Sequence, residues 1–205
     1  MLVLRDSAGH GVLPGRFIRE RRTIAETVRE TIELKLELDP GDISPVLLRV
    51  FDDPHRDARG WALSIAHAVT LPPERVASAP ADLVAVDLSG DLVTRETLGY
   101  DHNEIVREAV AAIRDRYEQT PDPDRLLDRP FTLSELRHVH EAVLGERLRK
   151  DTFNRRMSEQ LQPLYDESGE PLLQRGVGRP AQLFMRDRYS STGTVDRWRL
   201  PRAEG

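Results

Sequence analysis

Residues 131–157 read FTLSELRHVHEAVLGERLRKDTFNRRM, and they predict two short helices separated by a tight turn. Thr132 and Glu135 have the spacing of a capping box, which fixes the first turn of a helix through reciprocal side-chain-to-backbone hydrogen bonds. Gly145 suits the left-handed residue that commonly ends a helix. A second helix is expected over 150–160.

The residues that follow predict a β-ribbon. Short runs of strand-forming residues occupy 161–165, 171–174 and 181–186, and a turn is expected at Asp166–Gly169. Two short helices, a tight turn and a β-ribbon are the pattern of a winged helix-turn-helix, whose second helix enters the major groove of DNA. The alternative is a helical hairpin with a ribbon that binds another protein.

Charge is distributed unevenly along the chain. Over 205 residues there are 30 Lys and Arg against 35 Asp and Glu, a net charge of -5. Residues 131–205 hold 13 basic and 11 acidic side chains, whereas residues 1–130 hold 17 and 24. The positive potential therefore lies in the C-terminal part and favours a polyanionic partner such as DNA, although a solvated surface of mixed charge has the same composition. The chain has no cysteine, which excludes disulfides and thiolate metal sites.

Several polar residues of this C-terminal part are candidates for DNA contact. With Phe153 and Met157 facing inward, the other faces of helix 150–160 carry side chains suited to base edges, since asparagine can pair with adenine and arginine with guanine. Residues at the helix start and in the glycine-rich loop after Gln174 are suited to phosphates or to a minor groove. The predicted DNA contacts are Arg149, Lys150, Thr152, Asn154, Arg155, Arg156, Arg175 and Arg179.

Lysine is rare in this chain. It occurs only at positions 35 and 150, and arginine supplies the other 28 basic residues. Acetylation can remove the charge of a lysine, so Lys150 is a hypothetical regulatory position. The alternative is an ordinary phosphate contact that is never modified.

The N-terminal part mixes helix and strand signals. Thr23 and Glu26 form another capping box, which predicts a helix that ends near Leu36, with Ile24, Val28 and Ile32 as its core stripe. The residues from Asp101 to Glu104 repeat this pattern, and a second helix is expected to run to about Gln119. Strands are expected at 2–5, 11–18, 43–51, 60–71 and 83–88.

The expected domain organisation follows from the segment 120–130. It contains three prolines in a polar context, which predicts a linker. We therefore expect an N-terminal domain over 1–119 and a C-terminal domain over 131–200. No segment approaches the ~20 apolar residues of a membrane span, and the N-terminus has no signal-peptide pattern, so a cytoplasmic location is expected.

The residues from Leu13 to Ile18 read LPGRFI and resemble the start of the Nudix box, LPGGF(V/I). The Nudix signature, G-x5-E-x7-R-E-U-x-E-E-x-G-U with U apolar, places glutamates on one helix, where they hold Mg²⁺ for the hydrolysis of a diphosphate. Laid on this chain without gaps, the first glutamate falls on Arg22 and the Glu-Glu pair falls on Leu34 and Lys35. The resemblance therefore implies a Nudix-like domain that has lost its metal ligands and its catalysis.

A register shifted by one residue recovers Glu30 and Glu33 at glutamate positions. It also puts Thr31 and Glu37 at the two apolar positions, and it still leaves Leu34 in place of the second glutamate of the pair. An active Nudix hydrolase remains the alternative to an inactive domain.

Two further motifs are similar to those of the ADP-ribose pyrophosphatase subgroup of the Nudix family. Residues 51–60 read FDDPHRDARG and match FxDPxRDPRG, and residues 99–105 read GYDHNEI and match (A/G)FDH-x-x-I. The resemblance implies that Arg56 and Arg59 bind a phosphate of an effector, since guanidinium groups pair with phosphates in a bidentate manner. The alternative is a solvated arginine pair, and His102 is expected to be structural.

The run 131–157 resembles FTLxELxxVYEAxLGxxLxxxxFRRK, and residues 175–184 match RGxGRPAxLF. These patterns belong to the NrtR-type Nudix-related transcriptional regulators. The resemblance implies an α+β fold, in which a Nudix-like α/β/α sandwich precedes a winged helix-turn-helix. It also implies a homodimeric repressor of NAD or related nucleotide and sugar metabolism genes, which binds operator DNA, senses ADP-ribose or a related nucleotide, and needs no cofactor. A protein-interaction module is the second alternative.

Overall fold

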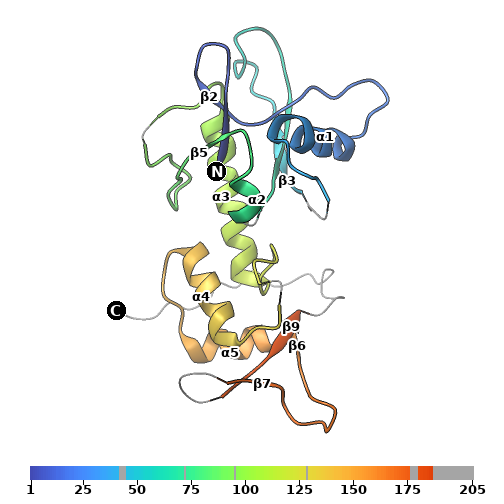
Figure 1. The fold of residues 1–205 in the computed structure, drawn as a ribbon. Helices are drawn as coiled ribbons and strands as arrows, with labels where there is room; N and C mark the ends of the chain where they lie inside the picture. Colours follow the sequence, from blue (N-terminus) through green and yellow to red (C-terminus); the bar gives the residue numbers. More distant parts are fainter. Residues whose placement is uncertain (42–44, 72, 95, 128, 176–179, 187–205) are drawn as a thin grey trace. The chain divides into compact units, whose positions relative to one another are not determined.

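The computed structural model describes residues 1–41, 45–71, 73–94, 96–127, 129–175 and 180–186. The chain divides into two compact units, Met1–Ile113 and Arg114–Gly205. Helix α3, His102–Gln119, begins in the first unit and ends in the second (Figure 1). Within the described ranges, no helix has both the length and the apolar character needed to cross a membrane.

The strands of the first unit form two antiparallel sheets. One has the order β2-β1-β5, and the other is the hairpin β3-β4, whose register shifts between Leu47 and Val50. The strands are β1 (Leu2–Arg5), β2 (Gly11–Val12), β3 (Val46–Phe51), β4 (Ser64–Ala68) and β5 (Asp82–Leu83).

Strands β2, β4 and β5 are shorter than the runs predicted at 11–18, 60–71 and 83–88. Strand β2 ends early because the Leu13 amide donates to Nδ1 of His102 at 2.9 Å, and Pro14 has no amide to donate. Runs of strand-forming residues therefore predicted where these strands lie in the chain, while tertiary contacts determine where they end.

The capping box at Thr23 is confirmed in helix α1, Ile24–Leu36. The Thr23 amide donates to Oε2 of Glu26 at 2.8 Å, and the Glu26 amide donates to Oγ1 of Thr23 at 3.1 Å. The predicted core stripe is partly wrong, because Ile24 is 41% exposed while Thr31 is buried. The Thr31 hydroxyl donates to the carbonyl of Thr27 at 2.7 Å, and this bond allows a polar side chain to be buried in the helix.

The capping box predicted at Asp101 is wrong. The Asp101 carboxylate accepts from Arg56, and Glu104 pairs with Arg49, so neither side chain caps the helix. Only the Asp101 carbonyl joins the first turn of α3, accepting from the amides of Glu104 and Ile105. A short helix that the sequence did not predict, α2, occupies Pro73–Val76.

The second unit has the predicted winged helix pattern, and the α+β fold class is confirmed (Figure 1). Strand β6 pairs with β9, and β7 pairs with β8, all antiparallel. The elements are α4 (Leu133–Leu144), α5 (Lys150–Ser158), β6 (Leu161–Pro163), β7 (Leu173–Gln174), β8 (Ala181–Gln182) and β9 (Phe184–Arg186).

The helix caps and the core residues predicted from the sequence of this unit are present in the structure. The capping box of Thr132 and Glu135 is present, and Gly145 has a φ of 71°, the left-handed conformation that favours glycine. Phe153 and Met157 are buried as predicted. In the segment predicted as a linker, Asp122 is fully buried and accepts from the amides of Leu126 and Leu127.

Candidate nucleic-acid interface and sensor site

The turn between α4 and α5 is fixed by a glutamate. Oε1 of Glu141 accepts from the Leu148 amide at 2.8 Å and from Nη1 of Arg137 at 2.5 Å. Partial burial acts to raise the pKa of Glu141, but the Leu148 amide and Arg137 lower it overall. The carboxylate therefore stays charged at neutral pH and holds the turn that leads into α5.

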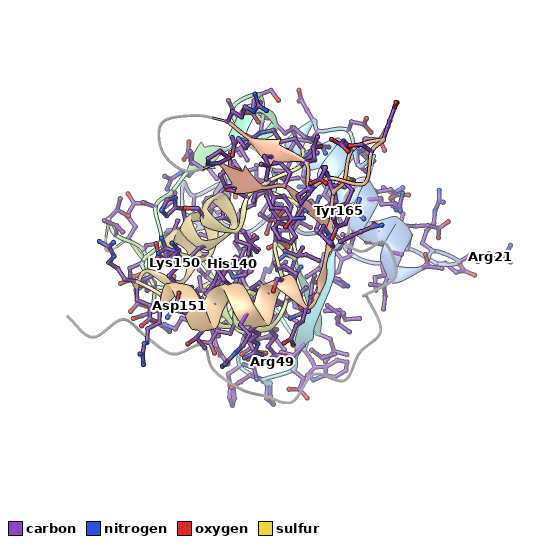
Figure 2. The ribbon with its side chains drawn as sticks, turned by 90° about the horizontal axis from the view of Figure 1, so that it is seen from below. Arg21, Arg49, His140, Lys150, Asp151 and Tyr165 are labelled. Atoms are coloured by element: carbon purple, nitrogen blue, oxygen red, sulfur yellow. The ribbon has the colours of Figure 1, made fainter. Side chains whose placement is uncertain are left out.

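Helix α5 presents one face to the core and another to solvent. Phe153 and Met157 are 1% and 0% exposed, and the rings of Phe153 and His140 are 5.1 Å apart. Figure 2 labels Lys150 and Asp151 at the start of α5 and His140 on the neighbouring α4. Lys150, Asp151 and Arg155 are exposed, so these side chains are available to a partner.

The predicted base-reading residues of α5 differ in their surroundings. Arg155 is exposed, and no ion pair is found for it within the described part of the chain. Arg156 is half-buried: desolvation lowers its pKa, and Glu118 at the end of α3 acts in the opposite direction. Oδ1 of Asn154 is buried without a hydrogen-bond partner among the described residues. Arg155 is thus the base-reading candidate with the most open position, while half-buried Thr152 lies at the border of the exposed face.

One end of the β-ribbon is acidic. The turn between β6 and β7 carries Asp166, Glu167 and Glu170, and Asp166 accepts from the amides of Ser168 and Glu170. The other end begins at Arg175, which is exposed. Arg179, the second predicted wing contact, lies outside the described residues. Since DNA repels carboxylates, the end that begins at Arg175 is the one suited to DNA.

We expect Arg155→Ala to lose about 1–3 kcal/mol of discrimination at one base pair in each half-site, because a bidentate arginine–guanine contact is worth that much. Fluorescence anisotropy with the promoter of the protein's own operon, and with single-base variants of it, measures this loss. Arg19→Ala, which removes an exposed arginine of the first unit, is the matched control and should bind as the parent does. Parent-like binding by Arg155→Ala would show that α5 does not read the bases.

The two predicted effector residues lie in one loop but in different environments. The Arg56 side chain is only 6% exposed and makes a bidentate ion pair with Asp101, with Nε–Oδ2 at 2.8 Å and Nη2–Oδ1 at 2.7 Å. The Arg59 side chain is 68% exposed, pairs with Asp57 at 2.7 Å and lies 5.1 Å over the ring of Tyr100. Hydrogen bonds from Arg59 lower the pKa of Asp57 to about 2.

The sequence analysis assigned no part in the sensor site to two residues next to this loop. Asp101 and Tyr100 are the contacts of Arg56 and Arg59, and both belong to the GYDHNEI motif. The motif drew attention to this stretch of the sequence. The sequence alone did not show that Tyr100 and Asp101 contact Arg59 and Arg56. His102, which was expected to be structural, accepts from the Leu13 amide through Nδ1, and burial lowers its pKa.

Two glutamates of α1, Glu26 and Glu30, lie close to arginines. Glu30 lies 4.0 Å from Arg16 and 3.5 Å from Arg22, and Arg22 also lies 3.5 Å from Glu26. Within the described ranges, no group of three or more acidic or histidine side chains is arranged to hold a metal ion. The negative charges of Glu26 and Glu30 are therefore compensated by guanidinium groups of Arg16 and Arg22.

Comparison with known proteins gives consistent matches. The family model described as "NrtR DNA-binding winged helix domain" matches residues 124–185. The "ADPR responsive transcriptional repressor NtrR" of Acinetobacter baylyi is 28% identical over 182 residues, which cover 84% of this chain and 68% of that protein.

Solved structures extend the likeness over both units. The crystal structure of Shewanella oneidensis NrtR complexed with a 27mer DNA is 28% identical, with a TM-score of 0.66 over 91% of this chain and 85% of that one. Another structure of Shewanella oneidensis NrtR is 25% identical, with a TM-score of 0.68 over 98% of this chain and 90% of that one. A MutT/nudix family protein from Enterococcus faecalis shares the fold at 19% identity, with a TM-score of 0.65 over 91% and 79% of the two chains. Residues 124–185 therefore form a winged helix domain of the NrtR type, and the chain as a whole is similar to Nudix-related transcriptional regulators of that type.

Proposed function

We propose that this protein represses transcription by binding operator DNA through α5 and the β-ribbon, and that ADP-ribose or a related nucleotide releases it. The main support for the proposal is that α5 has one buried face and one exposed face. Phe153 and Met157 anchor one face in the core, and Arg155 and Lys150 stand on the exposed remainder. This is the arrangement that a recognition helix needs to enter a major groove.

The relatives support the choice of ligands. The Acinetobacter baylyi relative is named as responsive to ADPR, and a Shewanella oneidensis relative has been crystallised with DNA. We propose that the regulated genes belong to NAD or related nucleotide metabolism. A single winged helix reads few base pairs, so we also propose a homodimer that binds two half-sites about one helical turn apart.

We propose that the effector reaches the sensor unit at Arg59 and Arg56. Arg59 is exposed and stacked on Tyr100, so a phosphate needs only to compete with Asp57 for its guanidinium. Arg56 is held by Asp101 and becomes available when that ion pair opens. A guanidinium fork binds phosphate and carboxylate oxygens with the same geometry, which makes such an exchange chemically simple.

The test of the proposed function is operator binding with and without ADP-ribose. Anisotropy of a labelled fragment from the protein's own promoter should give specific binding that weakens as salt rises, because phosphate contacts release counterions. ADP-ribose should lower the affinity, and AMP should serve as the comparison. Salt-independent binding, or no binding, would favour a protein-interaction module.

We expect no hydrolysis of ADP-ribose above background with Mg²⁺ or Mn²⁺. Arg22, Leu34 and Lys35 occupy the positions at which the Nudix signature has glutamates, and Glu30 is engaged by Arg16 and Arg22. Release of AMP, followed by chromatography over hours, measures this. A turnover that disappears on Glu30→Ala or Glu33→Ala would make the protein an active Nudix hydrolase.

A further inference from the structure

Helix α3 is anchored in the first unit by three separate contacts around its first turns. The carboxylate of Asp101, whose carbonyl joins the first turn of α3, is held by Arg56 in a pair whose side chains are only 6% and 14% exposed. The ring of His102 accepts from the Leu13 amide. Arg49 pairs with Glu104 and lies 3.8 Å from Glu108.

The other end of α3 contacts α4 and the residues that follow α5 in the second unit. Tyr117 is fully buried, and its ring is 5.1 Å from that of His140, which in turn is 5.1 Å from the ring of Phe153 on α5. Two residues after Tyr117, the carbonyl of Gln119 accepts from Nε2 of Gln160, which lies just after the end of α5, at 3.1 Å. The last turn of α3 therefore supports α5 along a continuous row of rings.

Nothing in the sequence of α3 gives it a hinge. Its 18 residues, HNEIVREAVAAIRDRYEQ, contain neither glycine nor proline, and one α-helix of this length is stiff. A displacement at its first turn is consequently difficult to absorb within the helix.

We propose that α3 is the mechanical link between sensor and DNA-binding unit, with Asp101 as its positioning residue and Tyr117 as the residue that reaches the recognition helix through His140 of α4. This inference rests on the proposed function, which supplies the effector phosphate as the signal. An effector phosphate that captures Arg56 frees Asp101, the first turn of α3 shifts, and the row Tyr117–His140–Phe153 carries the shift to α5. In the absence of the effector, the Asp101 carboxylate thus binds the Arg56 guanidinium in place of the effector's phosphate.

The first test compares Asp101→Asn with Asp91→Asn in the full chain. Both remove one carboxylate that pairs with an arginine at 2.7 Å, but the Arg107–Asp91 pair is 54% exposed on each side and should hold α3 only weakly. Hydrogen exchange without any ligand should show the peptide that covers α5 exchanging about fivefold faster in Asp101→Asn than in the parent, with no change in Asp91→Asn. Unchanged exchange in α5 of both variants would overturn the link.

This readout is independent of the proposed function, because it needs neither operator nor effector. The second readout is the ratio of operator Kd values with and without ADP-ribose, which for allosteric proteins is typically about 5–150. Asp101→Asn should bring this ratio close to one. If the unmodified protein does not bind its operator, the proposed function is wrong. The hydrogen-exchange result still tests whether α3 links the two units.

A second variant guards against the case in which Asp101→Asn simply unfolds the sensor unit. Ala111→Gly with Ala112→Gly softens the middle of α3 and leaves the contacts at both ends intact. ADP-ribose should still bind, as measured by calorimetry, but its effect on operator Kd should fall at least about fivefold. Ala142→Gly, at an exposed position of α4, is the control for reduced helix propensity and should keep the parent ratio. If the Ala111→Gly/Ala112→Gly variant keeps the ratio of operator Kd values of the unmodified protein, the proposal is contradicted.

Discussion

Phe153→Ala is expected to destabilise the winged helix unit by about 3–5 kcal/mol, the usual cost of truncating a buried phenylalanine. Phe153 is 1% exposed and packs on the ring of His140, so alanine leaves a cavity at the centre of the unit. Urea denaturation followed by circular dichroism measures the change, because the second unit contributes α4 and α5 to the helical signal.

Arg155→Ala is the matched control for this substitution. It lies two residues further along α5, is exposed, and should change the stability by no more than ~0.5 kcal/mol. A loss below 1 kcal/mol for Phe153→Ala would mean that α5 does not pack on α4 as described. The two variants together separate the core face of α5 from its DNA-binding face.

Acidification from pH 7 to pH 4 is expected to cost the second unit roughly 3 kcal/mol through His140 alone, at about 1.4 kcal/mol per pKa unit. Burial lowers the pKa of His140 from its ordinary value of 6.5 to about 4, while a hydrogen bond with the backbone of Tyr117 acts in the opposite direction. Above pH 6.5, His140 is neutral in both the folded and the unfolded chain, so it has no effect. Between pH 6.5 and 4 the unfolded chain binds a proton that the folded chain does not, and stability falls.

The groups around His140 define the control for this prediction. Its ring lies between Tyr117 and Phe153, and Nε2 accepts from the amide of Asp122 at 3.2 Å. Burial raises the pKa of Asp122, so this carboxyl opposes the effect of His140 as the pH falls. His140→Gln keeps an acceptor for the Asp122 amide but does not titrate, and the difference between parent and variant isolates His140. Equal pH dependence of the two proteins would contradict the prediction.

The sequence by itself determined the starts of α1 and α4 and the winged helix pattern. The capping boxes at Thr23 and Thr132 and the left-handed Gly145 depend on residues within one turn of each other, so local spacing is enough to identify them. The inward positions of Phe153 and Met157 also follow from helical periodicity. These features were predicted and are present in the structure.

The tertiary structure alone decided which polar side chains are free for function. Asp101 fits a capping box by spacing, yet it pairs with Arg56, which lies 45 residues earlier in the chain. Arg155 and Arg156 are adjacent in the sequence, but only Arg156 is half-buried and lies near Glu118 of α3. The state of a charged side chain depends on burial and on partners distant in sequence, and a local pattern contains neither.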